Sequence, residues 1–159
     1  MNPLLQILMG LLGTLGFNIL FNIRGKKLLF ATLGGLISWA VFLALGPILS
    51  DESVRYLIAT AAITVYGEIL ARVMKTPTTT FLVPSVIPLI PGSALYYTMN
   101  YALNKQWALF AQQAFYTLQL ALSLAVGIIA MTTITRLITL FINKYKLTKN
   151  SHHFHHSIK

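Results

Sequence analysis

Two ionisable residues of opposite charge lie within an otherwise apolar stretch of this chain. Glu68 and Arg72 are four residues apart, so on a helix they share one face and can pair. A carboxylate inside a membrane segment can carry a proton or hold an ammonium group, and a planar guanidinium can bind a carboxylate through two contacts. A structural ion pair, in which the two charges neutralise each other, is the alternative. The spacing is compatible with both roles.

A second source of chemistry is the backbone of residues 81–99, an apolar and uncharged run interrupted by Pro84, Pro88, Pro91 and Gly92. Each proline lacks an amide hydrogen and disfavours helical angles in the residue before it, so this run cannot form one regular helix. In a bilayer, unpaired backbone groups are tolerated only where protein or a wet cavity surrounds them. Discontinuous helices of this kind form substrate sites in transporters. The alternative is a structural helix with proline kinks.

The break is expected to expose backbone groups that can bind both ends of a small charged molecule. A helix that restarts after Gly92 has free amides near Ser93 and Ala94, and helix N-termini attract anions. Carbonyl groups freed before the break could contact an ammonium group, and Tyr96 could add a hydroxyl contact or gate the cavity. We therefore predict a substrate site from the following residues: Glu68, Arg72, Ile87, Pro88, Pro91, Gly92, Ser93 and Tyr96.

The composition is that of a membrane protein. Of 159 residues, 56% are hydrophobic and only 9% are charged, with a mean hydropathy of +0.71, whereas a soluble domain carries about 25% charged residues. The net charge of +9 comes from basic residues at the ends of apolar segments, where they set topology and do not indicate nucleic-acid binding. The apolar start at Pro3, with no basic region before it, predicts a first span and no cleaved signal peptide.

The apolar stretches predict an all-α membrane protein of five transmembrane helices, the fourth broken by prolines. The expected spans are 3–23, 28–49, 54–74, 81–103 and, after an interfacial start with Gln112 and Gln113, about 118–142. We expect residues 1–147 to form one membrane domain. Residues 148–159 form a polar tail with all four histidines, expected to be a disordered extension with only a weak metal-binding signal.

Glycines recur within the first two spans. Gly10, Gly13 and Gly16 are three residues apart, and Gly34 and Gly35 lie in the middle of the second span. Small residues let helix backbones approach closely in lipid. We expect these glycines to pack helices together.

The basic residues predict that the N-terminus is outside and the C-terminus is in the cytoplasm. With five crossings, only Arg55 and Lys105 are left outside, and the other ten basic residues face the cytoplasm, which is a strong positive-inside bias. If residues 81–103 formed a re-entrant hairpin, the five C-terminal basic residues would move outside, which argues against a hairpin.

Three stretches together resemble the threonine/serine exporter family (ThrE-like), specifically its small five-span subunit. The first combines Gly16-Phe17 with Phe21-Asn22, and the second is Glu68-Ile-Leu-Ala-Arg72 with Lys75 and Pro77. The third is Val86-Ile-Pro-Leu-Ile-Pro-Gly92 with Tyr96 beyond it, and its P-x-x-P-G stretch together with the upstream Arg72 is the most specific part. The resemblance extends to about Ala102 and does not include the histidine-rich tail.

The resemblance implies a subunit of a secondary exporter of small carboxylate-bearing metabolites in a bacterial cytoplasmic membrane. Threonine and serine are the substrates of fused family members, and dicarboxylates such as succinate are linked to split ones. It also implies a larger partner subunit of the same family, which a homo-oligomer could supplement. A non-transporting membrane scaffold and a small channel are the alternatives.

The same sequence argues against an enzyme. Its histidines are confined to the tail, it has three acidic residues and no cysteine, and no Ser-His-Asp set, zinc-ligand spacing or phosphate loop is present. We expect no catalytic residues, no metal site and no cofactor.

Overall fold

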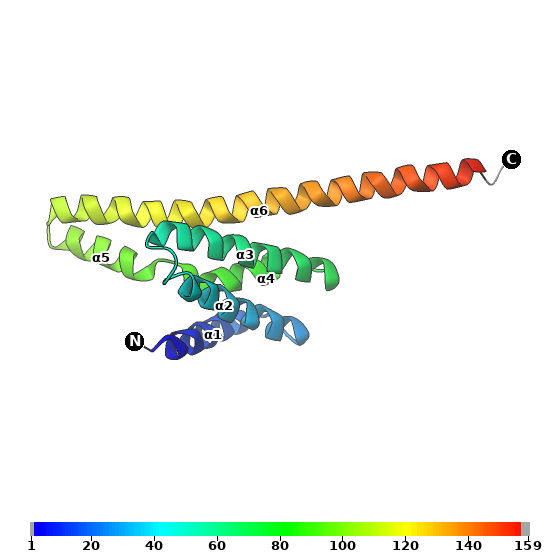
Figure 1. Ribbon diagram of the computed structural model, residues 1–159. Helices are drawn as coiled ribbons and strands as arrows, with labels where there is room; N and C mark the ends of the chain where they lie inside the picture. Colours follow the sequence, from blue (N-terminus) through cyan, green and yellow to red (C-terminus); the bar gives the residue numbers. More distant parts are fainter. Residues whose placement is uncertain (1, 157–159) are drawn as a thin grey trace.

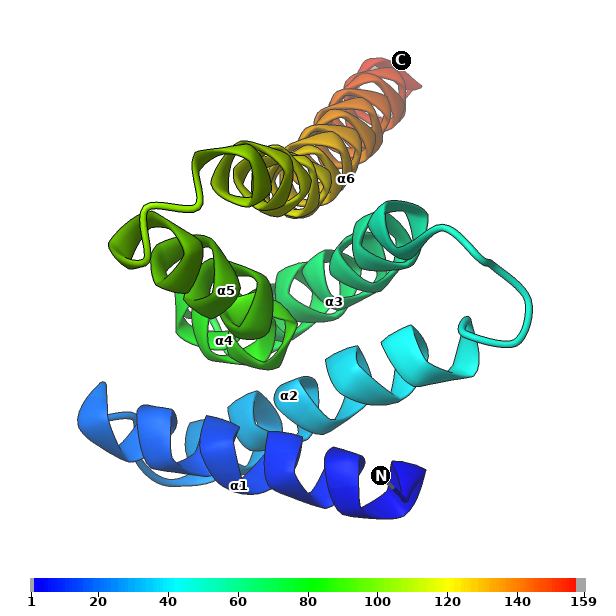
Figure 2. The same cartoon turned by 90° about the vertical axis from the view of Figure 1, so that its left-hand side faces the viewer.

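The computed structural model describes residues 2–156, and for residues 143 and 145–156 it describes only the backbone. Within this part of the chain every regular element is helical, in the order α1 (Pro3–Leu20), α2 (Lys26–Ala44), α3 (Glu52–Val73), α4 (Thr79–Val86), the short 3₁₀ helix η1 (Ile87–Leu89), α5 (Gly92–Leu103) and α6 (Trp107–His156). The helices run back and forth, and α1 and α2 lie on the opposite side of the α4–α5 segment from α6 (Figures 1 and 2).

The helix lengths fit a protein that crosses the membrane several times. Four helices, α1, α2, α3 and α6, are long and apolar enough to span a bilayer, and α4 with η1 and α5 adds a fifth span if the bent pair is counted as one. Helix α3 ends at one end of the bundle and α6 begins beyond the opposite end (Figure 1). The α4–α5 segment therefore connects the two ends, which favours a broken span over a re-entrant hairpin.

Two helix boundaries differ from the expected ones. Helix α2 ends at Ala44, short of the expected Leu49, because Pro47 cannot donate the next helical hydrogen bond. Helix α6 runs without interruption from Trp107, so the prediction of a separate interfacial segment before Leu118 is wrong. No proline or glycine lies between Trp107 and Leu118 to end a helix.

Helix α6 also extends beyond the other helices at both of its ends (Figure 1). Its first turns lie beside α5 and project past the ends of α1, α2 and α3. Its C-terminal part continues through most of the expected tail to His156. The histidine side chains lie outside the described residues, and the domain boundary near residue 147 stays a prediction.

Three interhelical turns share one geometry. Asn22, Lys75 and Lys105 follow α1, α3 and α5 with φ angles of 57°, 49° and 55°. The amide of the next residue then donates to a carbonyl in the last turn of the helix, for example Ile23 N to Asn18 O at 3.0 Å. This is the Schellman arrangement, which satisfies carbonyl groups that the helix end leaves open.

Much of the bundle interior is formed by small and hydroxyl-bearing side chains. Buried threonines and serines donate to carbonyls of their own helix, as in Thr64 Oγ1 to Thr60 O at 2.7 Å and Ser85 Oγ to Phe81 O at 2.6 Å. Polar contacts also connect neighbouring helices, for example Asn18 Nδ2 to Thr32 Oγ1 at 3.0 Å and Tyr66 Oη to the Phe30 carbonyl at 2.8 Å. Close packing and internal hydrogen bonds replace the hydrophobic force that is absent between helices in lipid.

The glycines divide into two groups. A Cβ at Gly35 would lie 2.5 Å from Thr14 Cβ, and one at Gly34 would lie 2.9 Å from Ser85 Cβ, so these positions do pack helices together. At Gly13 and Gly16 a Cβ would meet nothing within 4 Å. The expected packing role is therefore wrong for these two glycines within the single chain.

Gly35→Ala should destabilise the protein by about 1–3 kcal/mol, because the new methyl group overpacks the α1–α2 contact at Thr14. Gly16→Ala is the matched control, and it should be neutral or slightly stabilising because its methyl group enters open space and alanine favours helix. Unfolding of the purified protein in detergent measures both. Equal stability of the two variants would contradict the close α1–α2 contact.

Candidate functional site

The chain breaks between α4 and α5 with a bend of 57°. Pro84 lies inside α4, so the expectation that it disrupts the helix is wrong, and the break is confined to residues 87–91. Ile87 and Pro88 belong to η1. Pro91 has φ −75° and ψ 62°, the angles of an inverse γ-turn, and the Gly92 amide donates to the Ile90 carbonyl at 2.7 Å.

Tighter hydrogen bonds compensate for the acceptors that the prolines leave open. The Ile87 amide donates to Pro84 O, and the Ile90 amide donates to Ile87 O at 3.1 Å. The first helical bond of α5 is Leu95 N to Pro91 O at 3.0 Å. No side chain caps this helix, so the amides of Ser93 and Ala94 have no hydrogen-bond partner among the described residues. The break thus leaves open donors, as an anion site requires.

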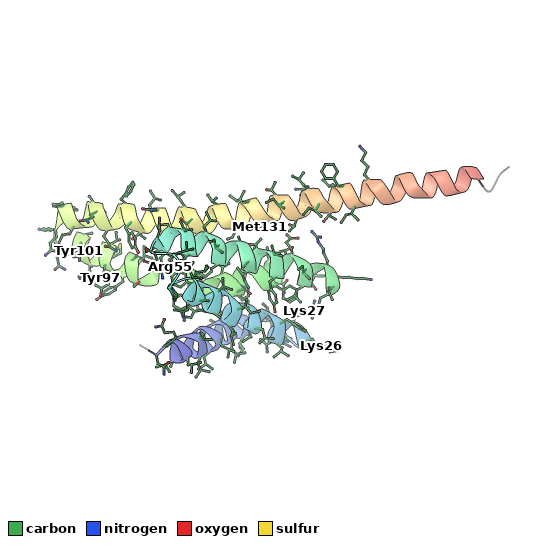
Figure 3. The ribbon with its side chains drawn as sticks, in the orientation of Figure 1. Lys26, Lys27, Arg55, Tyr97, Tyr101 and Met131 are labelled. Atoms are coloured by element: carbon green, nitrogen blue, oxygen red, sulfur yellow. The ribbon has the colours of Figure 1, made fainter. Side chains whose placement is uncertain are left out.

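The residues after the break lie on the surface of the single chain. Gly92 and Ser93 are exposed, and Tyr96 is 66% exposed. A Cβ at Gly92 would meet nothing within 4 Å. The rings of Tyr96 and Tyr97 meet edge to face at 5.5 Å, and Figure 3 shows Tyr97 and Tyr101 pointing away from the bundle on α5. This surface is therefore accessible to a substrate, to lipid or to a second subunit.

A groove of about 210 Å³ lies next to the break and joins α1, α2 and η1. It is lined by Gln6, Met9, Gly10, Trp39 and Pro88. The indole Nε1 of Trp39 is buried and has no hydrogen-bond partner among the described residues. The groove is mainly apolar.

Glu68 and Arg72 form a network at the far end of α3. The Arg72 guanidinium lies 3.4 Å from the Glu68 carboxylate and donates to the Thr135 carbonyl of α6 at 3.1 Å. The other Glu68 oxygen accepts from Thr78 Oγ1 at 3.3 Å, just before α4. The two side chains therefore connect α3 to α4 and α6, an arrangement that accounts for them without a substrate.

The structure does not bring this pair to the break. Leu89 and Ala94, on either side of the break, pack in one core cluster with Phe42 and Tyr56 near the start of α3. Ala71, next to Arg72, belongs to another cluster with Ala31 and Phe81. Tyr56 and Arg72 are sixteen residues apart on one helix, or roughly 24 Å at 1.5 Å per residue. The expected approach of Arg72 to the break is wrong.

Sequence reasoning missed a different arginine. Arg55 lies within the expected third span, where the charge pattern counts it only as an outside basic residue, yet its Nε atom is buried and its guanidinium carbon lies 5.1 Å from the centre of the Phe42 ring. Figure 3 shows Arg55 at the inner side of α3, at the end of the bundle opposite Lys26 and Lys27. Its position three residues after Glu52, on the same helix face, is the sequence signal that could have identified it.

Comparison with known proteins identifies the family of this chain. The sequence profile described as threonine/serine exporter, ThrE, matches residues 6–134, a range that begins within α1 and ends within α6. The chain belongs to the threonine/serine exporter family. No curated protein and no solved structure matches it. Exporter membership, together with the several apolar helices, indicates a multi-pass membrane protein that takes part in export.

The break lies within the part of the chain that matches the exporter family. Replacing Pro88 and Pro91 together by alanine should let α4 and α5 join, giving a protein that is at least as stable but exports poorly. Pro84→Ala is the control, because Pro84 lies inside α4 and its replacement leaves the break intact. Efflux per folded molecule is the measurement. A double variant that exports at the normal rate would show that the break is only a kink.

Gly92→Leu complements the proline variants. It should leave folding unchanged, because no atom of this chain occupies the space at Gly92. Loss of efflux from a normally folded Gly92→Leu protein would then report contact with a substrate or with another subunit.

Removing one member of the Glu68–Arg72 pair should cost more stability than removing both. Arg72→Leu leaves the Glu68 carboxylate, whose side chain is 15% exposed, without its partner charge. Glu68→Leu/Arg72→Leu should recover part of the loss, by about 1 kcal/mol, in detergent unfolding. Normal stability of Arg72→Leu with abolished efflux would instead assign Arg72 to the substrate.

Proposed function

We propose that this chain is one subunit of a secondary exporter of small carboxylate-bearing metabolites in a bacterial cytoplasmic membrane. The observation that carries the proposal is the broken α4–α5 segment in a chain of the threonine/serine exporter family. The substrate is an amino acid such as threonine or serine, or a dicarboxylate such as succinate. The site lies beside the break, where the Ser93 and Ala94 amides supply donors to a carboxylate.

The proposal includes a larger partner subunit of the same family. Secondary transporters commonly place their site between two repeats that move against each other, and this chain supplies one unit of four to five spans. The open surface at Gly92, Ser93 and Tyr96 supports a site that a second subunit completes. The same surface also suits the alternative, a scaffold that holds another membrane protein, so transport itself has to be measured.

Efflux of radiolabelled threonine and succinate from cells decides between the two functions. We expect little efflux from cells that express this chain alone, and export of one labelled substrate from cells that also express the protein encoded next to it. Pro88→Ala/Pro91→Ala serves as the inactive control. Full export by the purified single chain in liposomes would contradict the partner requirement. Export by the neighbouring protein alone, unchanged by this chain, would leave only the scaffold role.

A further inference from the structure

Arg55 is held on an aromatic platform that reaches the break. Its guanidinium carbon lies 5.1 Å from the Phe42 ring centre. The Phe42 ring stacks on Trp39 with ring centres 5.1 Å apart and tilts against Tyr56 at 4.7 Å. Phe42 and Tyr56 pack in the same core cluster as Leu89 and Ala94. The ring that carries Arg55 therefore belongs to the same core cluster as the two residues that flank the break.

This cation has no ion-pair partner among the described residues. Among the described residues the only ion pair within 4.0 Å joins Arg72 to Glu68. Arg55 Nε is buried and donates no hydrogen bond to any of the described residues. A guanidinium that is partly removed from water and left without an anion is costly, and its planar fork matches a carboxylate. Arg55 therefore offers an unused carboxylate-binding group.

The nearest acidic side chain in the sequence is engaged elsewhere. Glu52 lies three residues before Arg55, and its carboxylate accepts a hydrogen bond from the Tyr116 hydroxyl of α6. Tyr116 also packs against the core cluster that holds Phe42 and Tyr56. A positive and a negative group that do not pair with each other therefore lie on successive turns of α3.

We propose that Arg55 binds the carboxylate of the exported metabolite and that Glu52 selects for an ammonium group at its other end. The inference rests on the proposed export function and assigns its binding residues. A second carboxylate near Glu52 would be repelled, so the pair favours a zwitterion over a dicarboxylate.

A structural role for Arg55 makes a different prediction. Arg55 Nη1 lies 3.5 Å from the position of a Cβ at Gly46, just after α2, and a cation is favourable at a helix C-terminus. Lysine would keep that charge and the contact with the Phe42 ring but would lose the fork. Arg55→Lys therefore separates carboxylate binding from charge alone.

Exchange of labelled threonine tests the assignment. Membrane vesicles are prepared from cells that express this chain with its proposed partner subunit. Arg55→Lys should raise the threonine concentration for half-maximal exchange by about tenfold or more, because the variant loses roughly one charge-assisted hydrogen bond to the carboxylate. Arg136→Lys, on the exposed part of α6, is the matched control and should behave as wild type. The unfolding midpoint of each variant is measured in parallel.

Glu52→Gln supplies a second test, because its expected effects on threonine and on succinate have opposite signs. It should weaken threonine exchange and strengthen inhibition by unlabelled succinate, which a merely structural role of Glu52 would not do. Wild-type half-saturation in Arg55→Lys, or equal effects of Glu52→Gln on both compounds, would overturn the assignment. Wild-type vesicles that exchange neither compound would instead overturn the proposed export function.

Discussion

The structure depends on one constraint of the membrane interior, where no water replaces a missing backbone hydrogen bond. Pro88 and Pro91 remove two amide donors in the middle of an apolar segment. The chain meets the open carbonyls with 3₁₀ and γ-turn bonds from Ile87, Ile90 and Gly92. These turns set α5 at an angle of 57° to the α4–η1 segment. They also leave the backbone amides of Ser93 and Ala94 without hydrogen-bond partners among the described residues. Because α5 is redirected, its hairpin with α6 projects beyond the ends of α1, α2 and α3 (Figure 1).

The charged side chains at the two ends of the bundle differ in whether they pair. At one end, Glu68 and Arg72 use their hydrogen-bonding groups to hold α3 against α4 and α6. At the other end, Arg55 lies on Phe42 without an anion, and Glu52 is held by Tyr116. A paired charge at the first end connects helices, whereas the unpaired charge at the second is the group that we propose to bind a ligand. One end of the bundle is therefore held together by a pair of charged side chains, and the other end carries two charged side chains that do not pair with each other.

Local chemistry accounts for what the sequence could predict. Hydropathy identified the apolar segments. The missing amide hydrogens of Pro88 and Pro91 indicated where the helix breaks. The position of Pro84 inside α4 could not be predicted, because packing of this buried residue outweighs its effect on the helix. The separation of Arg72 from the break depends on which half of α3 contacts η1 and α5, and a spacing of four residues carries no such information. The role of Arg55 was missed for the same reason, since its platform joins residues from two helices. Topology relative to the membrane, partner and substrate stay predictions.

The central claim is that the break at α5 is open to water and to substrate, and the absence of cysteine from the chain allows a direct measurement. Single cysteines at Ser93 and, as a lipid-facing control, at Gly13 can be treated with a membrane-impermeant maleimide, which reacts with thiolates in water. Both positions are exposed in the single chain, so exposure alone does not distinguish them. The account predicts labelling of Ser93→Cys in the assembled exporter, slowed by threonine or succinate, and no labelling of Gly13→Cys. An unreactive Ser93→Cys, or labelling that neither compound slows, would contradict it.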